Sequence, residues 1–108
     1  MKSPGYYVTA ELRAKDPSRI AETKAALGEL CTPTREESGC SMFVVHHDAR
    51  TPTRFLLWEC WADEAAQKLH MSLPHTKAFL QRDLIEVLQF FQTEVVAPPD
   101  RAYANERL

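Results

Sequence analysis

The chain has 108 residues, a hydrophobic content of 44% and a formal net charge of −2 at pH 7. These values are typical of a single globular domain, because most domains hold about 100–150 residues. The basic residues are scattered and no apolar run approaches the ~20 residues that span a bilayer, so we expect no nucleic-acid or membrane partner. Three cysteines without close pairing favour free thiols in a reducing cytoplasm.

The first third of the chain predicts a strand followed by a helix. Residues 6–13 begin with β-forming side chains and then alternate, which is typical of a strand. Asp16 is a helix N-cap residue and Pro17 suits the first helical position. Apolar residues at helical spacing extend this helix over residues 17–32, and Pro33 is expected to end it.

Two strands are predicted next. Gly39 marks a turn into a strand over residues 40–47, and a polar turn over 48–53 leads to a third strand over 54–61. Both strands are apolar at consecutive positions. This pattern is typical of strands that are covered on both faces.

The last third predicts helix and then strand. Asp63 caps a second helix, and Pro74 begins a further helical segment that runs to about residue 84. A last strand is expected over residues 87–96. The prolines that follow cannot donate to a sheet ladder, so residues 98–108 are assigned to a C-terminal arm or tail.

The order β-α-β-β-α-β predicts an α+β fold of the ferredoxin-like, split-βαβ type, formed by residues 2–97. Its sheet is antiparallel and its helices cover one face only. Since the middle strands are apolar on both faces, the other face needs a partner. We therefore expect a homodimer packed sheet against sheet.

Glu59 is the first candidate for chemistry. Alternation places Leu57, Glu59 and Trp61 on one face of the third strand. A carboxylate among large apolar groups loses hydration, which raises its pKa and suits it to proton transfer. The alternative is a structural ion pair with an arginine or lysine that fixes the register of the strands.

Two histidines are the second candidates. His70 lies on the apolar stripe of the second helix, and His75 shares a face with Phe79 in the next segment. Buried histidines often only donate to a carbonyl group. Imidazole is nevertheless the side chain best suited to proton transfer near neutral pH. Both histidines are expected to point toward the strand face that holds Glu59 and Trp61. This combination predicts a pocket with proton-transfer groups.

The remaining chemical groups predict no metal or nucleotide site. His46 and His47 are adjacent in a strand and point to opposite faces, so they cannot share one metal ion there. No glycine-rich phosphate loop, paired CxxC or HExxH motif is present. Cys40 and Cys60 lie on strands without a fixed basic neighbour, so neither is expected to be an activated nucleophile.

Taken together, these motifs resemble the antibiotic biosynthesis monooxygenase family, and its quinol-monooxygenase-like members most of all. The resemblance is carried by Glu37-Ser-Gly-Cys40, Phe55-x-x-Trp58-Glu59-x-Trp61, Ala62-Asp63-Glu64-Ala65, His70 and Pro74-His75-x-x-x-Phe79. It covers nearly the whole chain. The family implies a dimeric α+β barrel, in agreement with the expected homodimer.

The resemblance also implies an activity. Family members of known activity oxygenate small electron-rich aromatics, such as quinols and polyphenols, with dioxygen and without metal or flavin. A base, a water-poor pocket and an aromatic wall suffice for this chemistry. By this resemblance we expect no cofactor, and we assign roles as follows: His70 or His75 as base, Glu59 as its orienting partner or as a hydrogen-bond partner of substrate, and Trp61, Phe79, Leu57 and Tyr7 as substrate-binding residues.

Two other functions stay open at this point. The same pocket suits a dimeric barrel that binds a small metabolite without reaction, because fold does not settle function. It also suits an oxygen-independent isomerase or hydratase of a small signalling metabolite. A haem-degrading branch of the fold uses an asparagine in the first strand. The only asparagine here is Asn105 in the tail, so haem degradation is not expected.

Overall fold

The computed structural model describes residues 5–97, which form four strands, three α-helices and a short 3-10 helix. In chain order the elements are β1 (Tyr6–Ala14), η1 (Pro17–Arg19), α1 (Ile20–Arg35), β2 (Cys40–His47), β3 (Arg54–Trp61), α2 (Glu64–Ser72), α3 (Pro74–Gln81) and β4 (Ile85–Thr93). The predicted order is confirmed, with the second helical region divided at Pro74. The predicted arm over residues 98–108 lies outside the described residues.

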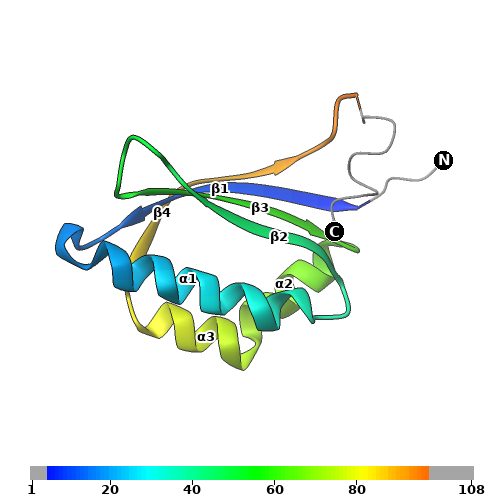
Figure 1. Ribbon diagram of the computed structural model, residues 1–108. Helices are drawn as coiled ribbons and strands as arrows, with labels where there is room; N and C mark the ends of the chain where they lie inside the picture. The colour runs from blue at the N-terminus through cyan, green and yellow to red at the C-terminus, as the bar shows by residue number, and fades with distance from the viewer. Residues whose placement is uncertain (1–4, 98–108) are drawn as a thin grey trace.

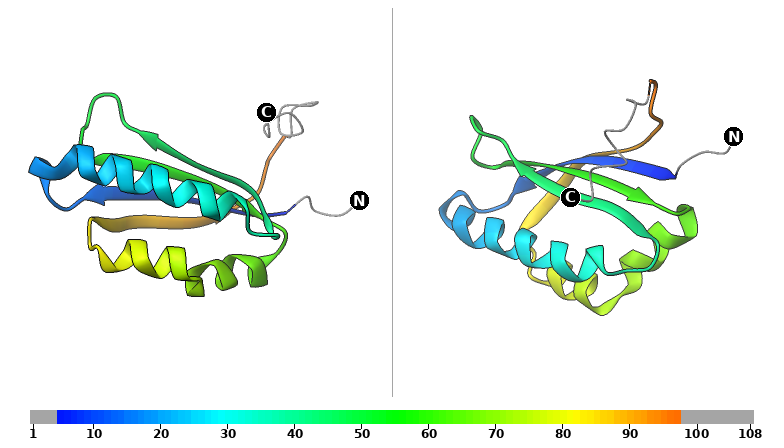
Figure 2. Two further views of the ribbon diagram at one scale, coloured as in Figure 1. Left: turned by 60° about the horizontal axis from the view of Figure 1, so that its bottom comes forward. Right: turned by 45° about the vertical axis from the view of Figure 1, so that its right-hand side comes forward.

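The four strands form one antiparallel sheet in the order β2-β3-β1-β4. All three α-helices lie on the same side of it (Figures 1 and 2). The helix α1 packs against β2 and also against α3. The predicted α+β, ferredoxin-like class is therefore confirmed, and the sheet has one covered and one open face.

The start of the first helix is as expected, but its end is not. Asp16 accepts a hydrogen bond from the Ser18 N–H at 2.9 Å, and Pro17 opens η1, which leads into α1. The prediction that the helix ends at Pro33 was wrong, because α1 continues to Arg35. Proline removes one backbone donor, but two more residues still complete the final turn.

The later helices begin at their predicted residues. The Asp63 carboxylate accepts from the Ala66 N–H at 2.9 Å and caps α2, and Pro74 is the first residue of α3. The predicted end near residue 84 was wrong, since α3 ends at Gln81. No helix within residues 5–97 is long and apolar enough to cross a bilayer.

The last strand also begins earlier than predicted, at residue 85 rather than 87, and ends at 93 rather than 96. Asp83 takes a left-handed backbone conformation (φ 56°), which turns the chain sharply after α3. Ile85 then pairs with Ala14 at the end of β1. Pairing with β1 therefore sets where β4 begins, and this is not visible in the local sequence.

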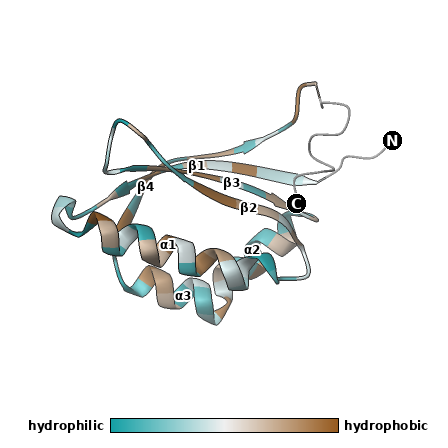
Figure 3. Cartoon of the chain, in the orientation of Figure 1, coloured by the Kyte–Doolittle hydropathy of each residue, from teal (hydrophilic) through white to brown (hydrophobic). Residues whose placement is uncertain are grey.

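The hydrophobic core fills the space between the sheet and the helices. Side chains of β1 alternate strictly, so Val8, Ala10 and Leu12 are buried while their neighbours face away. Figure 3 shows the apolar stretch of β2 that adjoins this core. On β3 the same face presents Phe55 and Trp61, both almost fully buried.

Candidate active site

Glu37 lies in the short connection between α1 and β2. Its N–H donates to the Thr34 carbonyl at 3.1 Å, so this connection continues from the last turn of α1. Gly39 then passes α2 so closely that a Cβ there would lie 2.5 Å from the Cβ of Ala66. The Ala62 N–H donates to the Gly39 carbonyl at 2.8 Å. This close passage holds the Glu37 side chain beside α2.

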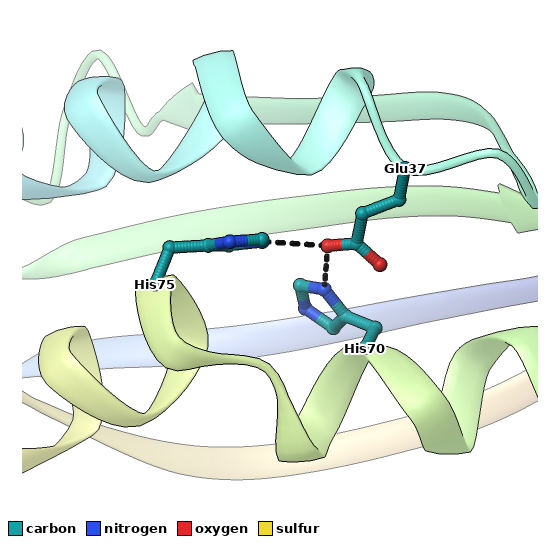
Figure 4. Close-up of side chains that lie close together, drawn as sticks. All are labelled: Glu37, His70 and His75. Atoms are coloured by element: carbon teal, nitrogen blue, oxygen red, sulfur yellow. Dashed lines mark hydrogen bonds and ion pairs between the residues drawn. The ribbon is translucent and has the colours of Figure 1, made fainter.

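Both candidate histidines meet the Glu37 carboxylate. His70 comes from the last turn of α2 and His75 from the first turn of α3. His70 Nδ1 lies 2.7 Å from Glu37 Oε2, and His75 Nε2 lies 2.6 Å from the same oxygen (Figure 4). Because α2 and α3 meet at Pro74, two adjacent helix ends present their imidazoles to one point.

The carboxylate fixes where the histidine protons sit. An ionised carboxylate only accepts hydrogen bonds, so each nitrogen that contacts Glu37 carries its hydrogen. In its neutral form His75 therefore holds its lone pair on Nδ1, and His70 holds its lone pair on Nε2. After proton uptake, the negative charge of Glu37 stabilises the imidazolium. Glu37, His70 and His75 are called the cluster below. The cluster can thus act as a base, with a histidine that is held in place by the Glu37 carboxylate.

The two histidines differ in exposure. The His70 side chain is only 5% exposed, and its ring centroid lies 4.9 Å from that of Trp61 and 5.5 Å from that of Phe43. The His75 side chain is 23% exposed. His75 is therefore the member that a small molecule can reach, while His70 is enclosed by aromatic rings.

His75 also lines a pocket of about 210 Å³ between α1 and α3. Phe79 is one of its walls, and Arg82 stands beside it, in ion pairs of 3.6 Å with Glu22 and Glu29. His75 and Phe79 lie together, as their helical spacing indicates. Besides His75, the lining of the pocket is mostly apolar, and its charged members are Glu29 and Arg82.

Glu59 is buried on β3, with 4% of its surface exposed. Burial raises the pKa of Glu59 to about 7, and the charge of Glu37 adds to this rise. The hydrogen bond that Trp61 Nε1 donates to Glu59 Oε1, at 2.7 Å, opposes the rise. Within residues 5–97 neither a histidine nor a basic side chain pairs with Glu59. The carboxylate that contacts the histidines is Glu37 instead.

The other predicted pocket residues are not gathered at the cluster. Leu57 is partly buried against the core, on the helix-covered face of β3. Tyr7 alternates with the buried Val8, so it lies on the opposite face of the sheet from the histidines. There it lines a separate hollow of about 320 Å³ together with Trp58.

The cysteines show no sign of nucleophilic chemistry. All three are free, and burial raises the pKa of the Cys40 thiol to about 11, with a further rise from the charge of Glu37. A raised thiol pKa keeps the sulfur protonated and weakly nucleophilic. The raised pKa of Cys40 agrees with the expectation that this thiol is not activated.

Glu37 is a functional candidate that could not be recognised from its sequence surroundings. It is separated from His70 by 33 positions and from His75 by 38, so no local spacing links them. The available signal was its place in the Glu37-Ser-Gly-Cys40 motif, directly before a glycine turn. Sequence position alone does not reveal which side chain this turn approaches.

A sequence model of the antibiotic biosynthesis monooxygenase family matches residues 5–82, which include the whole cluster. The chain is 28% identical over 90 residues to the uncharacterized protein YjcS of Bacillus subtilis strain 168, covering 83% of this chain and 86% of YjcS. A solved structure of YjcS superposes with a TM-score of 0.77, over 83% of this chain and 97% of that one.

Two further solved structures are similar. PA3566 from Pseudomonas aeruginosa is 23% identical, with a TM-score of 0.77 over 90% of this chain and 100% of PA3566, which shows a shared fold. A candidate antibiotic biosynthesis monooxygenase from Bacteroides thetaiotaomicron VPI-5482 is 27% identical, with a TM-score of 0.75 over 87% of this chain and 92% of that protein.

Proposed function

We propose that this chain, which belongs to the antibiotic biosynthesis monooxygenase family, is an oxygenase of small electron-rich aromatic molecules such as quinols or polyphenols. The observation that carries the proposal is the pair of His75 and Glu37 beside an apolar pocket. A histidine held by a buried carboxylate suits the removal of a proton from an aromatic hydroxyl group.

The chemistry requires little from the protein beyond this base. Removal of the hydroxyl proton by His75 Nδ1 gives a phenolate, which is electron-rich enough to donate an electron to dioxygen. A ring carbon then forms a bond to one oxygen atom and the O–O bond breaks. The hydrogen of that ring carbon and the hydroxyl hydrogen leave with the other oxygen atom as water, and the ring becomes a quinone, so no external reductant is consumed. The electron donor is the substrate itself.

The surroundings of the cluster support the same function. His75 is the more exposed histidine, and Phe79 offers an aromatic wall in the same pocket. The enclosed side of the cluster is formed by His70 and Trp61, whose rings are in contact. An apolar enclosure strengthens the attraction between Glu37 and an imidazolium, because the effective dielectric constant is low there.

We further propose that two chains pack sheet against sheet. On the open face, Thr9 pairs with Trp58 on one side and Phe91 on the other, so these aromatic residues form one row. Trp58 is 40% exposed and Phe91 is 49% exposed. A second copy that covers this row removes aromatic surface from water, which favours association.

Oxygen consumption by the metal-free protein tests the oxygenase proposal. A panel of quinols and polyphenols is supplied, and product mass is measured under ¹⁸O₂ with autoxidation controls. We expect enzyme-dependent uptake of one dioxygen per substrate and one labelled oxygen atom in the product. A product of unchanged mass formed without dioxygen contradicts the proposal and indicates an isomerase. Tight binding of these aromatics without any turnover contradicts it in favour of a binding protein.

A further inference from the structure

The three residues of the cluster also have the chemistry of metal ligands. A carboxylate oxygen of Glu37 and one ring nitrogen each of His70 and His75 all lie within 4.8 Å of one another. Two imidazole nitrogens and one carboxylate oxygen are ligands that divalent first-row transition metals accept. These ligands come from a loop and two helices, so they do not form a compact metal-binding motif in the sequence.

The two nitrogens converge on a single point. His70 Nδ1 and His75 Nε2 approach the same Glu37 oxygen, at 2.7 and 2.6 Å. A metal ion binds imidazole nitrogen at about 2.0–2.1 Å. An ion near the position of that oxygen therefore requires that the carboxylate withdraw by about one metal–oxygen bond length and that each imidazole approach by about 0.6 Å. Glu37 stands on a connection rather than within a helix or strand, so its side chain can withdraw, and small rotations of the two imidazoles can close the remaining distance.

The local charge also favours a cation. The Glu37 side chain, which carries the negative charge of the site, is only 9% exposed. Within residues 5–97 no lysine or arginine pairs with it. A buried negative charge without a fixed basic partner is costly, and a bound cation offsets that cost.

We propose that Glu37, His70 and His75 form a binding site for one divalent first-row transition-metal ion, with Zn²⁺ as the reference ion. Three protein ligands leave at least one coordination position for water or a small molecule, as in sites that are not purely structural. The partly exposed His75 and the pocket it lines provide the route of entry. The site does not depend on the protein being an oxygenase.

Metal binding has a consequence for the base, and this consequence rests on the proposed function. Zn²⁺ takes the lone pair of His75 Nε2, so in the bound form the ring hydrogen lies on Nδ1. Nδ1 then has no lone pair with which to take a proton from substrate. Zn²⁺ is therefore expected to inhibit oxygen consumption, and chelation is expected to restore it.

The binding test uses the untagged full chain, treated with a chelator and then freed of it. Zn²⁺ is titrated by calorimetry and Co²⁺ by visible absorption, without substrate. We expect one ion per chain. His75→Ala and Glu37→Gln should each weaken binding by about a hundredfold or more, because loss of an outer-shell partner alone often costs 10–100-fold. A His46→Ala/His47→Ala double variant should bind as the unaltered chain does.

A nitrogen-detected NMR experiment on the unaltered chain gives the same answer without any variant. Zn²⁺ should shift His70 Nδ1 and His75 Nε2 most, and leave the ring nitrogens of His46 and His47 nearly unchanged. Equal binding by His75→Ala and the His46/His47 double variant would overturn the proposal, as would shifts confined to His46 and His47. Because no substrate is present, either result leaves the oxygen measurement to be judged separately.

Discussion

His75 Nε2 lies 2.6 Å from Glu37 Oε2, although 38 positions separate the two residues. A histidine so held has one nitrogen fixed as a donor and the other available as an acceptor. This relationship defines the candidate active site, because it joins His75, the more exposed of the two candidate histidines, to a carboxylate that is only 9% exposed.

The first prediction concerns the charge of Glu37. Glu37→Gln preserves size but removes the charge that stabilises the imidazolium and fixes its tautomer. We expect kcat/KM for the best quinol to fall by about a hundredfold or more. Glu36→Gln, an exposed neighbour, is the matched control and should retain full activity. Equal activity of the two variants would show that the carboxylate has no part in catalysis.

The second prediction concerns pH and stability. The pKa of Glu59 is raised from 4.5 to about 7 by burial, so the folded state holds this proton more tightly than the unfolded state. Its contribution to stability is therefore fully present below pH 4.5 and is lost as pH rises through about 7. The loss is about 3 kcal/mol in order of magnitude.

This loss is measured by urea denaturation of Glu59→Gln and of the unaltered chain over a range of pH. The difference between their free energies of unfolding isolates Glu59, because the contributions of the other titrating groups cancel. Glutamine can still accept from Trp61 Nε1, and it does not ionise. We expect the variant to gain stability relative to the unaltered chain between pH 5 and pH 8. A difference that is independent of pH would mean that Glu59 titrates at its ordinary pKa.

The third prediction concerns Gly39. An alanine there places its Cβ 2.5 Å from the Cβ of Ala66, which cannot rotate away. We expect Gly39→Ala to lower the free energy of unfolding by about 1–3 kcal/mol and to reduce activity by moving Glu37. In Gly28→Ala the added Cβ meets nothing within 4 Å, and it lies in α1. That control should gain about 0.5–1 kcal/mol. Thermal unfolding of both variants checks the contrast, and similar losses would contradict it.

The fourth prediction concerns the open face of the sheet. A Phe91→Lys/Trp58→Lys variant places like charges where two sheets are proposed to meet. We expect light scattering to give a dimer mass for the unaltered chain and a monomer mass for this variant. Leu80→Lys, at an exposed position on α3, should remain dimeric. An unaltered chain that is monomeric at micromolar concentration contradicts the proposed dimer.

Most of the fold could be predicted because its signals are local. The caps at Asp16 and Asp63, the break at Pro74 and the bounds of β3 all depend on residues that are close in sequence. The family was likewise identified from motif order, and the match over residues 5–82 confirms it. The quinol-like subtype remains a proposal.

The parts that could not be predicted depend on tertiary contacts. The start of β4 is set by the pairing of Ile85 with Ala14. A register shift between Glu11 and Leu12 also changes which residues of β1 and β4 lie opposite each other. The partner of the histidines is Glu37 rather than Glu59, because a glycine turn brings a distant loop against α2. Alternation placed Glu59 on the correct face but did not reveal its hydrogen bond to Trp61.

The proposed function assigns to His75 the removal of the proton that starts the reaction. Its most direct test compares oxygen consumption by the chelator-treated unaltered chain, His75→Ala and His46→Ala, with the best quinol under saturating dioxygen. Circular dichroism melting establishes that each variant is folded. We expect kcat to fall by about a hundredfold or more in His75→Ala and to be unchanged in His46→Ala. Equal turnover by the two folded variants would contradict it.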